Sequence, residues 1–152
     1  MRGLLRMKRI VGVIGASRCG KEIYNAAEEV GRLLARNDVL LITGGLTGVM
    51  EAASKGAYLE GGLTVGILPG YDKKDANPYV LVPLATGMGE ARNALIARAC
   101  DTLIAIGGEY GTLSEIALGL KMGKKVIGLL TWDIPGIIKV KTPQDAVNEA
   151  LR

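Results

Sequence analysis

One local pattern occurs three times in this chain: an apolar run ends in glycine and is followed by apolar residues at helical spacing. The apolar runs are residues 9–15, 39–43 and 101–106. They do not alternate with polar residues, so each predicts a strand that is covered on both faces, as in a parallel sheet. The repeat therefore predicts a Rossmann-like, doubly wound α/β fold with a mainly parallel sheet and helices on both faces.

The rest of the chain continues this alternation. Helices are expected after the three runs, and further elements are expected as strands at 63–68, 79–82 and 125–130 and helices at 87–99 and 143–151. The last helix has a strong start signal, with Thr142 at the N-cap and Pro143 at the first helical position. Polar residues 71–78 predict a loop, and a lid over a site is one role for it. A length of 152 residues fits one domain, 1–152.

Composition excludes several classes of function. The chain has no histidine, which excludes Ser-His-Asp and Cys-His catalysis and every His-based metal centre, and its two cysteines make neither a disulfide framework nor a zinc site. The net charge of +4 is spread thinly and aromatic residues make up only 4%, so we expect no nucleic-acid partner. No run is long enough for a membrane span, and we expect a cytoplasmic protein that binds an anionic small molecule.

The three glycine turns predict one ligand site. In a parallel sheet the loops after all strands lie along the carboxyl edge, where glycines allow close approach and helix N-termini present free N–H groups to a phosphate. The residues that we expect to contact a phosphorylated ligand come from these turns and from the helix at 87–99. They are Gly15, Ser17, Arg18, Gly44, Gly45, Gly48, Asn93, Gly107, Gly108, Gly111 and Thr112.

Two well-known nucleotide motifs are incomplete. Residues 15–21 have the spacing of a P-loop, but Glu22 stands where the magnesium-binding hydroxyl belongs, which argues against NTP hydrolysis. The first strand is not followed by G-x-G-x-x-G, so NAD-dependent hydride transfer is disfavoured.

Arg92 and Glu115 are the candidate reactive pair. Arg92 lies in the first turn of a helix, where a cation is disfavoured unless an anion is near, and Glu115 follows the third glycine turn. Both follow carboxyl ends of strands and are expected to meet at one site. A structural alternative remains open for Thr112 and Glu115, because they also fit a capping box in which Thr112 is the N-cap.

The motifs at 89–93, 101–106 and 107–115 together resemble the Lonely Guy phosphoribohydrolases and the related molybdenum cofactor carrier proteins, a group often called lysine decarboxylase-like. This resemblance implies hydrolysis of the N-glycosidic bond of a nucleoside 5′-monophosphate to base and ribose 5-phosphate. It assigns the catalytic roles to Arg92 and Glu115, and it implies no required cofactor, no metal, and a homo-oligomer, dimer or tetramer.

Two positions depart from the enzyme pattern. The enzymes have Pro-Gly-Gly where this chain has Gly107-Gly108-Glu109, and a lysine where it has Asn93. With Asn93 after Arg92 the chain is more similar to the carrier branch, which implies the alternative of a non-catalytic protein that binds molybdopterin. Glu109 also places a negative charge close to the expected phosphate, which lowers affinity unless it turns away or pairs with Arg18 or Arg92.

Overall fold

The computed structural model of the protein describes residues 7–152, which form a seven-stranded sheet in which every strand pair is parallel. The strand order is β4-β3-β2-β1-β5-β6-β7. The strands are β1 (Ile10–Gly15), β2 (Leu40–Thr43), β3 (Thr64–Leu68), β4 (Val82–Ala85), β5 (Thr102–Ile106), β6 (Lys125–Leu129) and β7 (Ile138–Val140). The predicted Rossmann-like α/β fold is confirmed.

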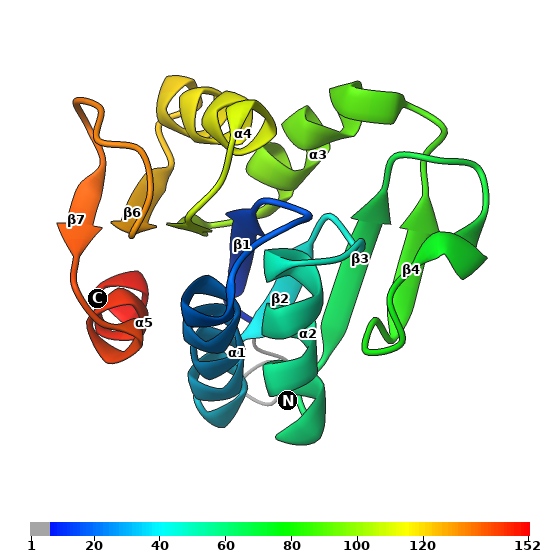
Figure 1. The fold of residues 1–152 in the computed structure, drawn as a ribbon, viewed down its shortest axis with the longest axis horizontal. Helices are drawn as coiled ribbons and strands as arrows, with labels where there is room; N and C mark the ends of the chain where they lie inside the picture. Colours follow the sequence, from blue (N-terminus) through cyan, green and yellow to red (C-terminus); the bar gives the residue numbers. More distant parts are fainter. Residues whose placement is uncertain (1–6) are drawn as a thin grey trace.

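Helices cover both faces of the sheet. Figure 1 shows α1, α2 and α5 on one face and α3 and α4 on the other. The helices are α1 (Lys21–Arg36), α2 (Val49–Leu59), α3 (Arg92–Ala99), α4 (Tyr110–Lys121) and α5 (Pro143–Leu151), with short 3-10 helices η2 (Lys73–Asp75) and η3 (Gly89–Ala91). Two apolar clusters result, one around Val13 and Val30 and one around Ile96 and Ile116. Among residues 7–152, no helix combines the length and hydrophobicity that membrane crossing requires.

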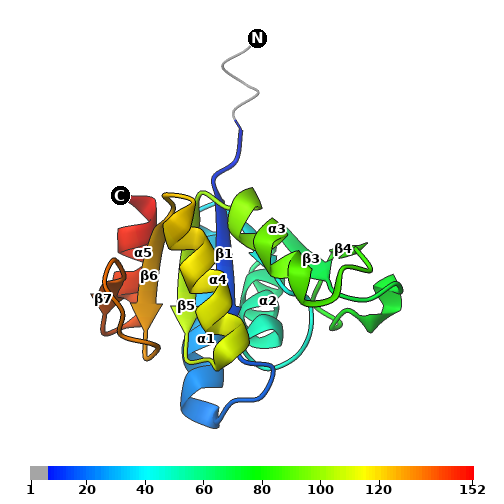
Figure 2. The ribbon, with the colours of Figure 1, turned by 90° about the horizontal axis from the view of Figure 1, so that it is seen from above.

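The direction of winding reverses at the centre of the sheet. From β1 the chain adds β2, β3 and β4 on one side, then returns to place β5, β6 and β7 on the other. The loops that leave β1 and β5 therefore diverge to opposite faces, into α1 and α4, and open a crevice at the carboxyl ends of these strands. Figure 2 shows α3 and α4 side by side across this region.

Two helix starts test the predicted caps. At α5 the prediction is confirmed, because the Thr142 side chain accepts a hydrogen bond from the Asp145 N–H at 3.0 Å. At α4 the capping-box interpretation is wrong, because the helix begins at Tyr110 and its N-cap is Glu109. Thr112 is thus the third helical residue, and Glu115 lies in the second turn, where it cannot fold back on the N-cap amide.

The largest differences from the predicted elements lie at the two edges of the sheet. Strand β4 spans Val82–Ala85 rather than 79–82, and β7 was not predicted at all. Within the predicted loop 71–78, Asp72 caps the single turn η2 by accepting from the Lys74 N–H at 2.8 Å.

Candidate functional site

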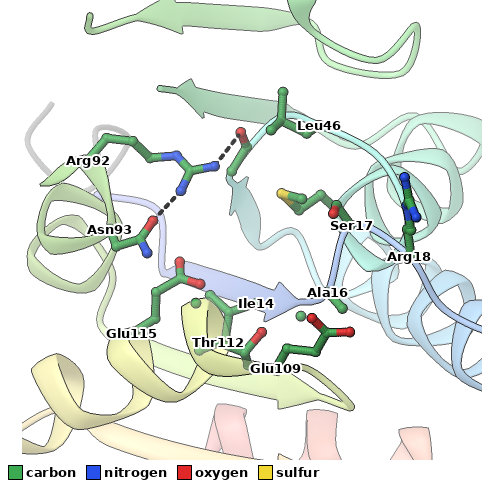
Figure 3. Close-up of a pocket in the computed structure, with 14 residues that line it drawn as sticks. Ile14, Ala16, Ser17, Arg18, Leu46, Arg92, Asn93, Glu109, Thr112 and Glu115 are labelled. Carbon is green, nitrogen blue, oxygen red and sulfur yellow. Dashed lines mark hydrogen bonds between the residues drawn. The ribbon is translucent and has the colours of Figure 1, made fainter. Parts of the chain in front are cut away.

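A cavity of about 460 Å³ opens at the carboxyl edge, between the loops that follow β1 and β5. This volume lies in the range of small-molecule sites, roughly 300–1,000 Å³. Figure 3 shows that Arg92, Asn93 and Glu115 gather at one end, with Ser17 and Arg18 at the other. The lining residues are Ile14, Gly15, Ala16, Ser17, Arg18, Gly44, Leu46, Met50, Arg92, Asn93, Glu109, Gly111, Thr112 and Glu115.

Arg92, the first residue of α3, is held at three points. Its Nε donates to the Ile67 carbonyl at 2.9 Å and its Nη2 to the Gly44 carbonyl at 3.4 Å, and its Nη1 donates to Oδ1 of Asn93. The side chain is half-buried, and burial lowers the pKa of its guanidinium, an effect that the Glu115 charge opposes. These contacts fix the direction of a cation that remains open to the cavity on one side.

Asn93 connects the arginine to helix α4. Its Oδ1 accepts from Arg92 and its Nδ2 donates to Oγ of Ser114 at 3.2 Å, and Ser114 in turn donates to the Gly111 carbonyl at 2.6 Å. Asn93 is buried and lines the cavity. A lysine at this position could not accept from Arg92, since an ammonium has no acceptor. The structure therefore gives Asn93 a role in orienting Arg92, in addition to its place in the cavity wall.

Glu115 is a buried carboxyl in the wall of the cavity, with 7% of its surface exposed. Burial raises the pKa of Glu115 to about 7, and the nearby Arg92 charge opposes this shift. Carboxyls of this kind serve as general acids or bases at neutral pH, because both protonation states are populated there.

Arg92 and Glu115 influence each other without direct contact. Each charge shifts the pKa of the other, yet none of the ion pairs within 4 Å among residues 7–152 joins them. Both side chains border the same space in Figure 3. A cation and a carboxyl separated in this way can act on two parts of one ligand, the cation on an anionic or electron-rich oxygen and the carboxyl on a centre of developing positive charge.

The other end of the cavity suits an anion. Helix α4 begins at Tyr110, and the first N–H groups of a helix have no partner within it, so the backbone near Gly111 and Thr112 presents donors beside the cavity. The loop after β1 contributes Gly15, Ser17 and the exposed Arg18 on the facing side. A phosphate between these elements would meet backbone dipoles and a cation, and also the carboxylate of Glu109, the N-cap of α4.

Four of the predicted glycines lie outside the cavity wall: Gly45, Gly48, Gly107 and Gly108. Gly48 instead allows two loops to touch, since a Cβ there would lie 2.3 Å from the Ala16 carbonyl oxygen and its φ is +64°. The same loops are tied by a hydrogen bond from Thr47 Oγ1 to the Ser17 carbonyl at 2.8 Å. These glycines shape the turns around the cavity, and the lining is supplied by their neighbours.

Five lining residues were not among the predicted contacts. Ile14, Ala16, Leu46 and Met50 are apolar or small and carry no chemical signal, although each adjoins a predicted glycine turn. The fifth, Glu109, is exposed and lines the cavity rather than turning away from it. It forms none of the ion pairs found among residues 7–152, so neither Arg18 nor Arg92 neutralises it.

Among residues 7–152, no group of three or more Cys, Asp or Glu side chains is arranged to hold a metal ion.

The chain has relatives in archaea and plants. An uncharacterised protein of Archaeoglobus fulgidus is 50% identical over 140 residues, which are 91% of each chain. A probable cytokinin riboside 5′-monophosphate phosphoribohydrolase of rice, Oryza sativa subsp. japonica, is 34% identical over 141 residues. That match covers 84% of this chain but 55% of the rice protein, so this chain corresponds to little more than half of that relative.

Solved structures match over a larger share of both chains. The molybdenum cofactor binding protein of the phototrophic bacterium Rippkaea orientalis is 35% identical with a TM-score of 0.90, over 94% of this chain and 95% of the other. The molybdenum cofactor carrier protein of Chlamydomonas reinhardtii is 34% identical with a TM-score of 0.87, over 95% and 99%. The sequence profile of the SLOG cluster4 family matches residues 8–150. This chain therefore belongs to the SLOG cluster4 family.

Proposed function

We propose that the cavity binds a nucleoside 5′-monophosphate and hydrolyses its N-glycosidic bond to base and ribose 5-phosphate. The observation that carries this proposal is the state of Glu115, a buried cavity carboxyl whose pKa is raised to about 7 and which no arginine neutralises by direct contact. The plant relatives named as cytokinin riboside 5′-monophosphate phosphoribohydrolases support the reaction class.

The proposed reaction breaks the bond between C1′ of the ribose and the base nitrogen. Positive charge develops on C1′ and the ring oxygen as the base leaves, and the ionised Glu115 stabilises this charge or takes a proton from the attacking water. The water oxygen becomes the C1′ hydroxyl, and its proton balances the negative charge left on the departing base. The Arg92 guanidinium stays charged throughout and holds an oxygen of the substrate.

The phosphate gives the substrate its orientation. We place it between the N-terminus of α4 and the loop of Ser17 and Arg18, at the end of the cavity opposite Arg92. With the phosphate bound at one end, the sugar points toward Glu115. The binding energy of the phosphate then holds the glycosidic bond next to this carboxyl.

A second candidate is a carrier that holds molybdopterin without chemistry. Two observations favour it: solved molybdenum cofactor proteins match nearly the full length of both chains, and Asn93 stands where the phosphoribohydrolases have a lysine. In this alternative the phosphate of the pterin occupies the same end of the cavity. Arg92 and Glu115 then bind the ligand and catalyse nothing.

Release of free base separates the two candidates. The purified protein is incubated with a panel of nucleoside 5′-monophosphates that includes AMP, GMP and cytokinin riboside 5′-monophosphates, and base and ribose 5-phosphate are measured together. The proposal requires equal amounts of both products from at least one substrate, with Glu115→Gln as the control of strongly reduced activity. Absence of base from every substrate would refute it, and a pterin found by mass spectrometry in the purified protein would establish the carrier.

A further inference from the structure

Hydrogen bonds from side chains outside the cavity hold the turn that leads into α4. Its residues Gly107 and Gly108 have φ of +58° and +109°, a backbone region that costs energy for other residues. A turn of this kind is free to adopt other conformations unless its carbonyls are held, because glycine is the most flexible residue. The next residue along, Glu109, lines the cavity, so the shape of the turn sets part of the cavity wall.

Two neighbouring side chains donate hydrogen bonds to this turn. The Thr131 hydroxyl donates to the Gly107 carbonyl, and the Trp132 indole Nε1–H donates to the Glu109 carbonyl at 3.1 Å. The Glu109 carbonyl also accepts the first hydrogen bond of α4, from the Leu113 N–H at 3.0 Å. The indole therefore fixes the carbonyl on which the helix begins.

The donors themselves are firmly placed. Trp132 packs against the apolar cluster around Ile96 and Ile116 beneath α3 and α4, and its ring lies 6.0 Å from that of Tyr110, tilted by 32°. Leu130, just before the pair, has φ of +55°, which a branched residue rarely adopts. Such strain persists only where surrounding contacts demand it, and here it turns the chain after β6 back toward the glycine turn.

We propose that Thr131 and Trp132 are positioning residues that hold the Gly107–Glu109 turn, and with it the start of α4, in the shape that binds the phosphorylated ligand. Neither residue lines the cavity, so their effect passes through the backbone of the turn. The ligand-binding part of this inference rests on the proposed function, while the effect on the turn does not.

The test compares variants that lose a donor with variants that keep it. Thr131→Val and Trp132→Phe each remove one hydrogen bond, and Thr131→Ser keeps the hydroxyl. Thr142→Val is the matched control, since it removes a threonine hydroxyl that caps α5, away from the cavity. Any effect of lost stability alone should appear in this control as well.

Amide hydrogen exchange measures the turn directly. The Gly107 and Leu113 N–H groups bracket the turn and are bonded to the Leu129 and Glu109 carbonyls. We expect their exchange to become at least fivefold faster in Thr131→Val and Trp132→Phe, with Thr131→Ser and Thr142→Val close to the unmodified protein. Unchanged exchange in the two donor-deficient variants would overturn the proposal.

Calorimetric titration with ribose 5-phosphate measures the consequence for binding. This probe carries the phosphate and sugar that every proposed substrate shares. We expect the dissociation constant of ribose 5-phosphate to be about 5- to 20-fold larger in Thr131→Val and Trp132→Phe than in the unmodified protein. Equal affinity in these variants would overturn the role in ligand binding. If the unmodified protein fails to bind ribose 5-phosphate while the exchange rates respond, the proposed phosphate site is refuted and the positioning of the turn stands, whereas the proposed reaction is refuted only by the absence of base release.

Discussion

Arg92 and Glu115 border one cavity from adjacent helices, and no ion pair within 4 Å joins them in the described part of the chain. Arg92 directs its guanidinium to backbone carbonyls and to Asn93, so three hydrogen bonds orient it without the carboxylate. Glu115 remains buried with a pKa of about 7. A direct salt bridge would have held this carboxyl permanently ionised, whereas the observed separation leaves it able to titrate near neutral pH.

The rate of base release should depend on pH through Glu115. If the ionised carboxylate is the active form, kcat/KM rises as pH increases and levels off above about 7, since the pKa of the free protein governs this ratio. The residual activity of Glu115→Gln should not show this rise of kcat/KM with pH. A substrate phosphate ionises near the same pH and could also cause kcat/KM to rise. A rise that persists in Glu115→Gln comes from the phosphate, and a rise that disappears comes from Glu115. A profile identical in both proteins would contradict the role of Glu115.

Stability should respond to pH in the opposite direction. The folded pKa of about 7 lies above the ordinary value of 4.5, so the folded state binds the proton more tightly than the unfolded state. The free energy of unfolding therefore falls as pH rises from about 4.5 to about 7, by up to about 3 kcal/mol from this group at 1.36 kcal/mol per pKa unit. Glu115→Gln removes the cost of the buried charge and should stabilise the protein at pH 8 but not at pH 4.5. Urea unfolding at both pH values measures this, and equal effects at both would contradict it.

Glu109 should oppose the binding of anions. Its carboxylate lines the cavity without an ion-pair partner among residues 7–152, and a phosphate nearby would be repelled. Glu109→Gln should strengthen binding of ribose 5-phosphate by about 3- to 10-fold, less at high salt. Glu60→Gln, which removes an equal charge at the C-terminal end of α2, is the control and should change affinity less than twofold. Weaker binding in Glu109→Gln would show that the carboxylate contacts the ligand favourably.

Leu130 is a site where a substitution should add stability. Its φ of +55° is tolerated better by asparagine than by leucine, and its side chain is 53% exposed, so little apolar burial is lost. Leu130→Asn should raise the free energy of unfolding by about 0.5–1 kcal/mol. Leu59→Asn is a matched control on ordinary helical backbone, 66% exposed, and should give no gain. Thermal denaturation of both variants distinguishes the two outcomes, and a loss of stability in Leu130→Asn would show that the leucine side chain contributes more than its strain costs.

The centre of the fold could be predicted from sequence because each element there carries a strong signal. The buried strands are continuous apolar runs and the glycine turns mark their ends, which also placed Arg92 and Glu115 at one edge of the sheet. The edges could not be predicted as well. Strand β7 has only three residues with Lys139 at its centre, so it lacks the apolar run of a buried strand. Strand β4 lies in an apolar run, but Pro83 within it cannot donate to a strand ladder, so the sequence does not show which residues of the run pair.

The sequence predicts several of the residues that line the cavity, but not where helix α4 begins or what holds the turn before it. Thr112 and Glu115 have the spacing of a capping box, yet the helix starts two residues before Thr112 because the Glu109 carbonyl accepts the first helical hydrogen bond. Sequence spacing cannot reveal where a helix begins when two starts are compatible with it. The contacts from Thr131 and Trp132 join residues more than twenty positions apart, and only the fold brings them together.

Parallel measurement of binding and turnover in Glu115→Gln tests the central claim most directly. The dissociation constant of a cleaved nucleoside 5′-monophosphate is compared with kcat for the same nucleotide in the variant and in the unmodified protein. We predict a dissociation constant within about threefold of the original and a kcat reduced by about 10²- to 10⁴-fold, as expected for loss of one acid-base group. An unchanged kcat in Glu115→Gln would contradict the claim that this carboxyl acts on the glycosidic bond.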